Sequence, residues 1–159
     1  MAFLKRAILN IIVILMLLPA STFAWSGKCV GIQDGDTITV LTEGKRQVRI
    51  RLYGIDCPES GQAFGTKAKQ YTADMVFKKD VEIKSTDTDR YGRTIAWVYI
   101  GEKCVNEEIL KAGLAWHYKK YSKERYLADL EDQARERKIG LWSDPHCMPP
   151  WEWRRKRSF

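Results

Sequence analysis

Five charged side chains have the types and spacing that cleavage of a phosphodiester would require. They are Asp36, Arg51, Asp56, Glu59 and Arg93. Three of them stand in the motif Arg-Leu-Tyr-Gly-Ile-Asp-Cys-Pro-Glu, and the other two belong to Asp-Gly-Asp-Thr and Asp-Arg-Tyr-Gly-Arg. Carboxylates can hold a metal ion and move a proton, and a guanidinium can bind phosphate through two N–H groups. We therefore expect the fold to bring these side chains into one solvent-open pocket.

Each of these side chains has a simpler interpretation when it is taken alone. Asp36 follows an Asp-Gly turn signal and could be a turn or capping residue. Arg51 could be a solvated sheet residue, and Arg93 could stabilise a loop. Independent structural roles would not be expected to reproduce every member of one site. The joint pattern therefore favours a functional site.

The region before residue 100 is predicted to be mainly β-structure. Alternating apolar residues on both sides of the turn signal Asp34-Gly35 predict a β-hairpin, and the alternation continues over residues 48–52. Because successive side chains of a strand point to opposite faces, Arg49 and Arg51 are predicted to point away from the core. One face of this sheet is expected to be core and the other to carry charge.

Three helices are predicted around the sheet. Apolar residues at helical spacing indicate an amphipathic helix over residues 61–79. Asn106 is predicted to cap a short second helix that ends before Gly113, and a third helix over residues 122–138 stops at Gly140. Two further strands between the first and second helices bring the expected strands to five. This order favours a small closed β-barrel with helical cover over a parallel doubly wound sheet.

Five motifs occur in an order that is specific when they are taken together. They are Asp-Gly-Asp-Thr, Arg-Leu-x-Gly-Ile-Asp-x-Pro-Glu, Asp-x-Tyr-Gly-Arg, Val-Asn-Glu followed by Gly-Leu-Ala, and Gly-Leu-Trp. With them the chain resembles the secreted thermonucleases, the staphylococcal-nuclease-like family, over about residues 28–142. The resemblance implies an α+β fold, a five-stranded oligonucleotide/oligosaccharide-binding (OB) barrel with three helices. It also implies hydrolysis of DNA and RNA with little sequence specificity, leaving 3′-phosphate ends.

The resemblance further implies the roles of individual residues. One Ca²⁺ would be held by the side chains of Asp36 and Asp56 and by the backbone carbonyl of Cys57, with Mg²⁺ the less favoured ion. The implied catalytic residues are Arg51, Glu59 and Arg93. Relatives often carry Thr at the position of Cys57; any residue supplies a carbonyl, but a thiol there could form a disulfide and make activity redox-dependent.

The chemistry of these groups is consistent with such roles. Two protein carboxylates should bind calcium weakly, with a Kd on the order of 10⁻⁴ to 10⁻³ M, which suits an extracellular enzyme. Arg51 and Arg93 can each make a bidentate contact with phosphate. Glu59 is the candidate general base for the attacking water, although it could instead order water and metal.

The N-terminal residues 1–24 have the layout of a secretory signal. Basic residues come first, an apolar run covers residues 7–18, and small residues precede a predicted cleavage after Ala24. The apolar run is shorter than the roughly 20 residues that span a membrane, so no stable anchor is expected. The predicted organisation is a signal peptide, a nuclease domain over residues 25–143 and an irregular Pro/Trp/Arg-rich tail over residues 144–159. The predicted location is the periplasm or the medium.

The composition indicates a basic, exported protein. The chain has 27 basic and 20 acidic residues and a net charge of +7, which favours polyanionic partners such as nucleic acid, anionic lipid or cell-wall polymer. Four cysteines, an even number, predict one or two disulfides in an oxidising compartment. They are Cys29, Cys57, Cys104 and Cys147. A monomer without a protein partner is expected.

Two substrate contacts and two alternative functions remain to be considered. Tyr118 and Tyr121 could stack on nucleotide bases, and the basic tail residues 154–157 could either contact phosphates or be a solvated end. One alternative is a non-catalytic OB-fold protein that binds single-stranded nucleic acid. The other is an envelope protein that binds anionic polymer through charge alone. Neither alternative explains the complete set of acids and arginines.

Overall fold

The first strand of the protein pairs with a different strand along each half of its length. The structure, a computed structural model, describes residues 24–157. Strand β1 (Ala24–Asp34) pairs antiparallel with β5 (Asp80–Thr88) near its start and with β2 (Thr37–Leu41) towards its end. A Cβ on Gly27 would lie 2.5 Å from the carbonyl oxygen of Leu41, so this close approach of two strands requires glycine. The predicted hairpin around Asp34-Gly35 is confirmed.

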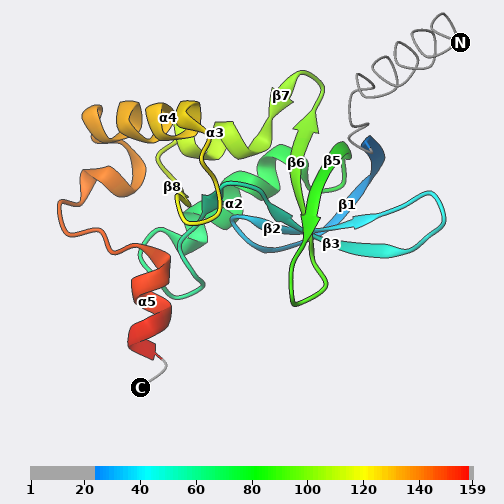
Figure 1. The fold of residues 1–159 in the computed structure, drawn as a ribbon, viewed down its shortest axis with the longest axis horizontal. Helices are drawn as coiled ribbons and strands as arrows, with labels where there is room; N and C mark the ends of the chain where they lie inside the picture. The colour runs from blue at the N-terminus through cyan, green and yellow to red at the C-terminus, as the bar shows by residue number, and fades with distance from the viewer. Residues whose placement is uncertain (1–23, 158–159) are drawn as a thin grey trace, which may run out of the picture.

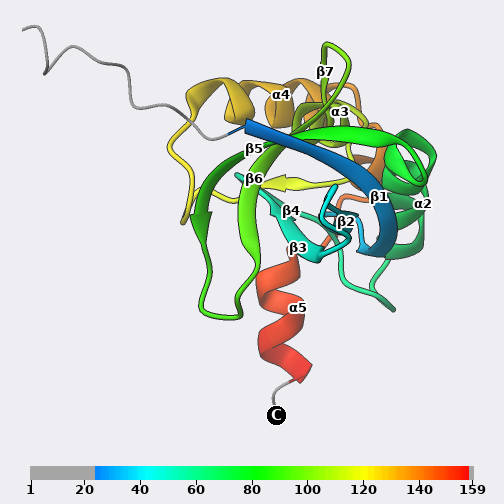
Figure 2. The same cartoon turned by 90° about the vertical axis from the view of Figure 1, so that its right-hand side faces the viewer.

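A parallel pairing closes these strands into a barrel. β3 (Gln47–Leu52) follows β2, and β6 (Thr94–Ile100) follows β5, each antiparallel to its predecessor. β3 and β6 then pair in parallel over three residues, from the pair Ile50 and Thr94 to the pair Leu52 and Ala96. The result is a closed five-stranded barrel with helices, seen from two sides in Figures 1 and 2. The predicted α+β class and OB-type barrel are confirmed.

The predicted alternation of faces along β3 is also observed. Ile50 and Leu52 are buried in the barrel together with Ile38, whereas Arg49 is exposed and Arg51 lies between these extremes. Apolar burial of this kind stabilises the fold by about 25 cal/mol per Å². The barrel core therefore fixes the direction in which Arg51 leaves the strand.

Three short strands complete the β-structure. β7 (Lys103–Cys104) extends the edge of β6, and β4 (Ile55–Asp56) pairs antiparallel with β8 (Trp116–His117). The pairing of β4 with β8 holds the segment that follows β3 against the segment that precedes the helix Arg125–Glu136. Asp56 is thus held by backbone hydrogen bonding and is only 1% exposed.

The helices lie outside the barrel, and the last one projects from it. They are α2 (Gly65–Val76), α3 (Val105–Lys111), α4 (Arg125–Glu136), the short 3₁₀ helix η1 (Gly140–Ser143) and α5 (Pro150–Arg157). α3 and α4 pack beside each other, and α5 extends away from the body of the molecule in both views (Figures 1 and 2). The helices predicted over residues 61–79 and 122–138 exist but are shorter. The first cannot begin earlier because Phe64 has a left-handed φ of 66°.

The role predicted for Asn106 as a helix cap was wrong. The residue at the N-cap of α3 is Cys104, and no side chain caps this helix. Asn106 is instead fully buried, where its Oδ1 accepts a hydrogen bond from the N–H of Val98 and its Nδ2 donates to the carbonyls of Tyr53 and Ala96. The Asn106 side chain therefore provides hydrogen-bond partners for buried backbone groups where β3 ends beside β6. A buried backbone group without a partner costs more free energy than a solvent-exposed helix end without a cap.

The prediction of disulfides is not supported either, because all four cysteines are free thiols. Cys29 and Cys57 are buried in the main core, and Cys147 packs against a second cluster formed around Trp116 and Trp142. Cys104, at the edge of β6, is buried as well. The cysteines thus fill separate packing positions, as small apolar side chains do.

The prediction of an irregular tail was also wrong, because residues 150–157 form helix α5. Pro150 stands at the first helical position, Glu152 lies in the first turn, and four basic residues lie in the last turn. Proline is favoured at the first position of a helix. The acidic residue and the basic residues each lie at the end of the helix dipole that their charge stabilises. Local preferences therefore support a helix that composition alone did not suggest.

The predicted signal peptide covers residues 1–23, which lie outside the described residues, and Ala24, which begins β1. Over residues 24–157, no helix combines the length and the apolar character needed to cross a bilayer.

Candidate active site

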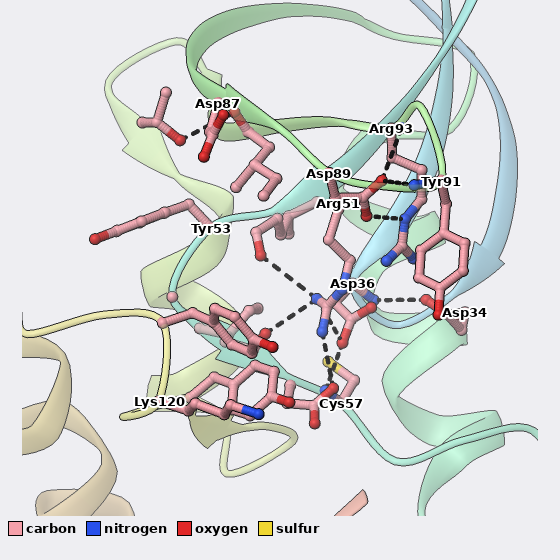
Figure 3. Close-up of a pocket in the computed structure, with 18 of the residues that line it drawn as sticks. Asp34, Asp36, Arg51, Tyr53, Cys57, Asp87, Asp89, Tyr91, Arg93 and Lys120 are labelled. Atoms are coloured by element: carbon pink, nitrogen blue, oxygen red, sulfur yellow. Dashed lines mark hydrogen bonds and ion pairs between the residues drawn. The ribbon is translucent and has the colours of Figure 1, made fainter. Parts of the chain in front are cut away.

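One open cavity of about 830 Å³ collects all the residues that the sequence predicted to be functional. Its lining includes Asp36, Arg51, Asp56, Cys57, Glu59, Arg93, Tyr118 and Tyr121. They come from the β1–β2 turn, the end of β3, β4 and the loop after it, the β5–β6 hairpin, and the segment between β8 and α4. Figure 3 shows several of these side chains directed at one another. The structure thus brings the whole predicted set together.

Arg51 lies at the centre of this cavity and joins two carboxylates. Its Nη1 lies 2.9 Å from Oδ2 of Asp36, and its Nη2 lies 2.8 Å from Oδ1 of Asp56. Nη1 also donates to the carbonyl oxygen of Ile55 at 3.0 Å. Burial alone would lower the pKa of Arg51, but Asp36 and Asp56 outweigh burial and raise it. The guanidinium is therefore permanently charged and held in one orientation.

Asp36 is buried and bound on both oxygens. Oδ2 accepts a hydrogen bond from the N–H of Cys57 at 2.6 Å, and Oδ1 accepts one from the hydroxyl of Thr37. Burial nevertheless raises the pKa of Asp36, because its favourable contact with Arg51 is opposed by the charge of Asp56. A carboxylate in this state would gain from a further positive charge.

Asp34 is a neighbour whose role the sequence analysis did not consider. Its Oδ1 accepts a hydrogen bond from the N–H of Asp36 at 3.1 Å. Burial, followed by the charge of Asp36, raises the pKa of Asp34 to about 7. The cavity therefore holds more acidic groups than its arginines neutralise.

Cys57 packs tightly against the turn that carries Asp36. A Cβ on Gly35 would lie 2.8 Å from the Sγ of Cys57 and 2.8 Å from the Cβ of Ala68 in α2. Burial raises the pKa of the Cys57 thiol well above its ordinary value, so the group is a neutral packing element. The thiol neither forms a disulfide nor has the ionisation expected of a nucleophile.

Glu59 is positioned by Gln62, a residue that the sequence analysis missed. The N–H of Glu59 donates to Oε1 of Gln62 at 3.0 Å, and the N–H of Gln62 donates back to the carbonyl of Glu59 at 2.9 Å. Nε2 of Gln62 then donates to the carbonyl of Met148 at 2.5 Å. A Cβ on Gly65 would lie 2.1 Å from the carbonyl oxygen of Glu59, so the start of α2 also presses on this loop.

Arg93 lines the cavity from the β5–β6 hairpin and contacts a different acid. Its Nε lies 2.7 Å from Oδ2 of Asp89, and its N–H donates to Oδ1 of the same residue (Figure 3). Asp89 stands in the same motif as Arg93. Its position four residues before Arg93 is the sequence feature that could have predicted this ion pair. This pair and the Arg51 cluster line the same cavity, and no ion pair among the described residues joins them.

Two tyrosines of the segment after β8 line the cavity, and an aromatic residue of the tail packs on one of them from outside the cavity lining. Tyr118 and Tyr121 meet edge to face with ring centroids 4.8 Å apart. The indole of Trp151 lies parallel to the ring of Tyr118, at 5.6 Å and an angle of 1°. Tyr121 is 61% exposed, and Nζ of Lys120 lies over its ring at 5.3 Å from the centroid. Trp116 is core, at 3% exposed.

Arg154, from helix α5, also lines the cavity, which the sequence analysis did not predict. Its Nη2 lies 2.8 Å from Oδ2 of Asp56, and its Nη1 lies 2.5 Å from Oε1 of Glu59. The tail had been considered only as a source of phosphate contacts or as a solvated end. Nothing in the local sequence indicates which carboxylate a tail arginine reaches.

The donor set of the cavity suits a hard cation. Among residues 24–157, no group of three or more His, Cys, Asp or Glu side chains is arranged to hold a metal ion. Two buried carboxylates, Asp36 and Asp56, nevertheless lie on either side of one guanidinium, and Glu59 lines the same cavity. When ionised, these three acids carry three negative charges against the two positive charges of Arg51 and Arg154, so the cluster keeps an excess negative charge that favours a cation. Carbonyl and water oxygens could complete such a site.

A small OB barrel with converging carboxylates and guanidinium groups defines a class of proteins suited to phosphodiester chemistry. A family model described as staphylococcal nuclease homologue matches residues 49–144. The chain therefore belongs to the staphylococcal nuclease family, and the resemblance stated from its motifs is confirmed.

Similar proteins occur in bacteria and plants. A micrococcal nuclease of Shigella flexneri is 39% identical over 94% of this chain and 91% of its own length. A protein of Haemophilus influenzae described as an uncharacterized endonuclease is 41% identical over 82% of this chain and 74% of its own. The staphylococcal-like nuclease CAN1 of Arabidopsis thaliana is 42% identical over 70% of this chain but only 35% of its own. The similarity to the two bacterial relatives thus covers most of both chains.

Proposed function

We propose that the protein is a calcium-dependent nuclease that hydrolyses DNA and RNA with little sequence specificity and leaves 3′-phosphate ends. The observation that carries this proposal is the convergence of Asp36, Arg51, Asp56, Glu59 and Arg93 on one open cavity. Family membership and the names of the relatives support the nuclease activity. The choice of ion and the nature of the product rest on the resemblance and on the oxygen-rich donor set.

Each side chain has a definite task in this proposal. Asp36 and Asp56 would hold the cation with the carbonyl of Cys57, and the bound cation would supply Lewis-acid stabilisation of charge on the phosphoryl group. Arg51 and Arg93, which line the same cavity, would bind phosphate oxygens. Glu59, which is partly exposed, would take the proton of the attacking water. Tyr118 and Tyr121 would provide stacking surfaces for bases.

Cleavage of single-stranded DNA by the purified protein tests this function. Fragments should form with added calcium and should not form after a chelator is added. Glu59→Gln should lower kcat by about 10²- to 10⁴-fold and leave KM near that of the wild type. Glu102→Gln, which changes an exposed glutamate outside the cavity, is the matched control and should retain activity. Binding of the DNA by the protein without formation of fragments would instead indicate a non-catalytic single-strand-binding protein.

Export remains a prediction from the N-terminal sequence. Secretion or transport to the periplasm would place the protein where calcium is abundant enough to fill a weak two-carboxylate site. Cleavage after Ala24 would remove Lys5 and Arg6 and no acid, and the remaining net charge of 25 − 20 = +5 would favour encounter with nucleic acid in either place.

A further inference from the structure

Helix α5 places a guanidinium on two of the carboxylates that the proposed function uses. Arg154 contacts Oδ2 of Asp56 at 2.8 Å and Oδ1 of the same residue at 3.3 Å. It also contacts Oε1 of Glu59 at 2.5 Å. Asp56 Oδ1 already accepts a hydrogen bond from Arg51. Both oxygens of a proposed cation ligand, and one oxygen of the proposed general base, are therefore engaged by arginine.

The position of Arg154 is built into the fold. Pro150 is buried, and Trp151 packs both on Tyr118 and on the cluster around Trp116. Residues three apart lie on the same side of a helix, so the packing of Trp151 directs Arg154 towards the cavity. The bond from Gln62 to the carbonyl of Met148 fixes the segment just before the helix to the loop of Glu59.

The other cations of α5 do not behave in this way. Arg155, Lys156 and Arg157 are exposed and form no ion pair with a carboxylate in the described part of the chain. A general attraction between a basic helix and an acidic cavity would not single out one of four successive cations. The selective pairing of Arg154 indicates a specific fit to Asp56 and Glu59.

A guanidinium and a divalent cation would need the same face of Asp56. When ionised, Asp36, Asp56 and Glu59 carry one more negative charge than Arg51 and Arg154 neutralise while Arg154 is docked. A cation that binds Asp56 through oxygen must displace at least one arm of Arg154, and that exchange has a cost in free energy.

We propose that Arg154 competes with the divalent cation for Asp56, so that helix α5 sets the affinity of the site for its metal ion. This inference rests on the cation site of the proposed function. Docked on the acids, Arg154 keeps Asp56 and Glu59 oriented and neutralised. When the cation binds, the guanidinium leaves Asp56 and frees Glu59 for proton transfer.

Isothermal titration calorimetry with calcium chloride alone tests the competition without recourse to activity. Arg154→Met keeps the aliphatic contacts of the side chain and removes its charge. Arg157→Met removes the same charge from the same helix, at a position that forms no ion pair with residues 24–157, and it is the matched control. We expect Arg154→Met to lower the Kd for calcium by about three- to tenfold at low ionic strength, with Arg157→Met within twofold of the wild type.

Three other results would overturn the inference. They differ in whether the calcium-dependent function proposed above would also be refuted. An equal Kd for the wild type and Arg154→Met would refute the competition and leave the cation site intact. A raised KM for single-stranded DNA in Arg154→Met, with an unchanged Kd for calcium, would make Arg154 a substrate ligand. Absence of calcium binding in both proteins would remove the competition together with the calcium dependence proposed above.

Discussion

A single side chain, Arg51, connects the two carboxylates on which the site depends. Asp36 and Asp56 are twenty residues apart in the chain, yet each lies within 2.9 Å of a different nitrogen of the same guanidinium. The alternation along β3 was enough to predict that Arg51 points away from the core. The sequence could not show that it would lie between two acids, because that depends on how the β1–β2 turn and β4 approach each other.

Replacement of Arg51 by lysine should therefore be severe. An ammonium group is a point charge and cannot pair with Asp36 and Asp56 in the fixed geometry of a fork. We expect Arg51→Lys to lower kcat by about 10²- to 10³-fold, the loss that follows removal of a preorganised charge donor. Steady-state kinetics on single-stranded DNA would measure it, with the exposed Arg46→Lys as control. Near-normal activity of Arg51→Lys would show that the fork is dispensable.

Among the elements, the β5–β6 hairpin has the clearest positioning role. Its turn is ordered by Asp89, which accepts hydrogen bonds from the N–H groups of Tyr91 and Arg93 and pairs with the side chain of Arg93. The motif predicted that Arg93 matters. It did not assign Asp89, whose contacts exist only once the turn has formed.

Asp89→Asn should misplace Arg93 and lower kcat/KM by about 10- to 100-fold. Burial raises the pKa of Asp89, but the hydrogen bonds from Arg93 and Tyr91 outweigh it, so the pKa lies below its ordinary value of 3.8. A lowered pKa stabilises the fold above the ordinary value, and the gain is lost as pH falls through the folded pKa. Denaturant unfolding should show wild type more stable than Asp89→Asn at neutral pH, with the difference shrinking below pH 3.8.

Asp80→Asn, at the exposed start of β5, the strand that leads into this turn, is the control and should match the wild type in both measurements. A difference between wild type and Asp89→Asn that persisted undiminished in acid would show that the charge of Asp89 is not what orders the hairpin.

At the scale of the whole molecule, the short β4–β8 pairing joins the barrel to the helices and buries a histidine. His117 is 4% exposed, and neither ring nitrogen has a hydrogen-bond partner within residues 24–157. Burial lowers the pKa of His117, and the nearby charge of Glu131 opposes this only in part. The folded protein therefore holds this imidazole neutral at a pH where the unfolded chain would protonate it.

The contribution of His117 to the free energy of unfolding should fall as pH drops below about 6.5, the ordinary pKa of histidine, because the unfolded state then binds the additional proton. The raised pKa of Asp34 contributes with the opposite sign over the same range, so the His117 contribution is the difference between the wild type and a variant that keeps Asp34. His117→Gln should lack this component between pH 7.5 and 5.5. Urea unfolding of both proteins across this range measures it, and His146, present in both, cancels in the comparison. Parallel pH profiles for the two proteins would refute the assignment.

The sequence by itself determined the barrel, the three helices predicted to cover it, the family and the five residues that the fold brings into one cavity, because alternation, helical spacing and short motifs are local signals. It also identified the faces on which Arg49 and Arg51 lie. Only the tertiary structure decided the free state of the cysteines, the burial of Asn106 between strands, and the docking of α5 with Arg154 on Asp56 and Glu59. Those outcomes depend on contacts between segments as many as 98 residues apart, and no local pattern encodes which of the four tail cations meets which acid.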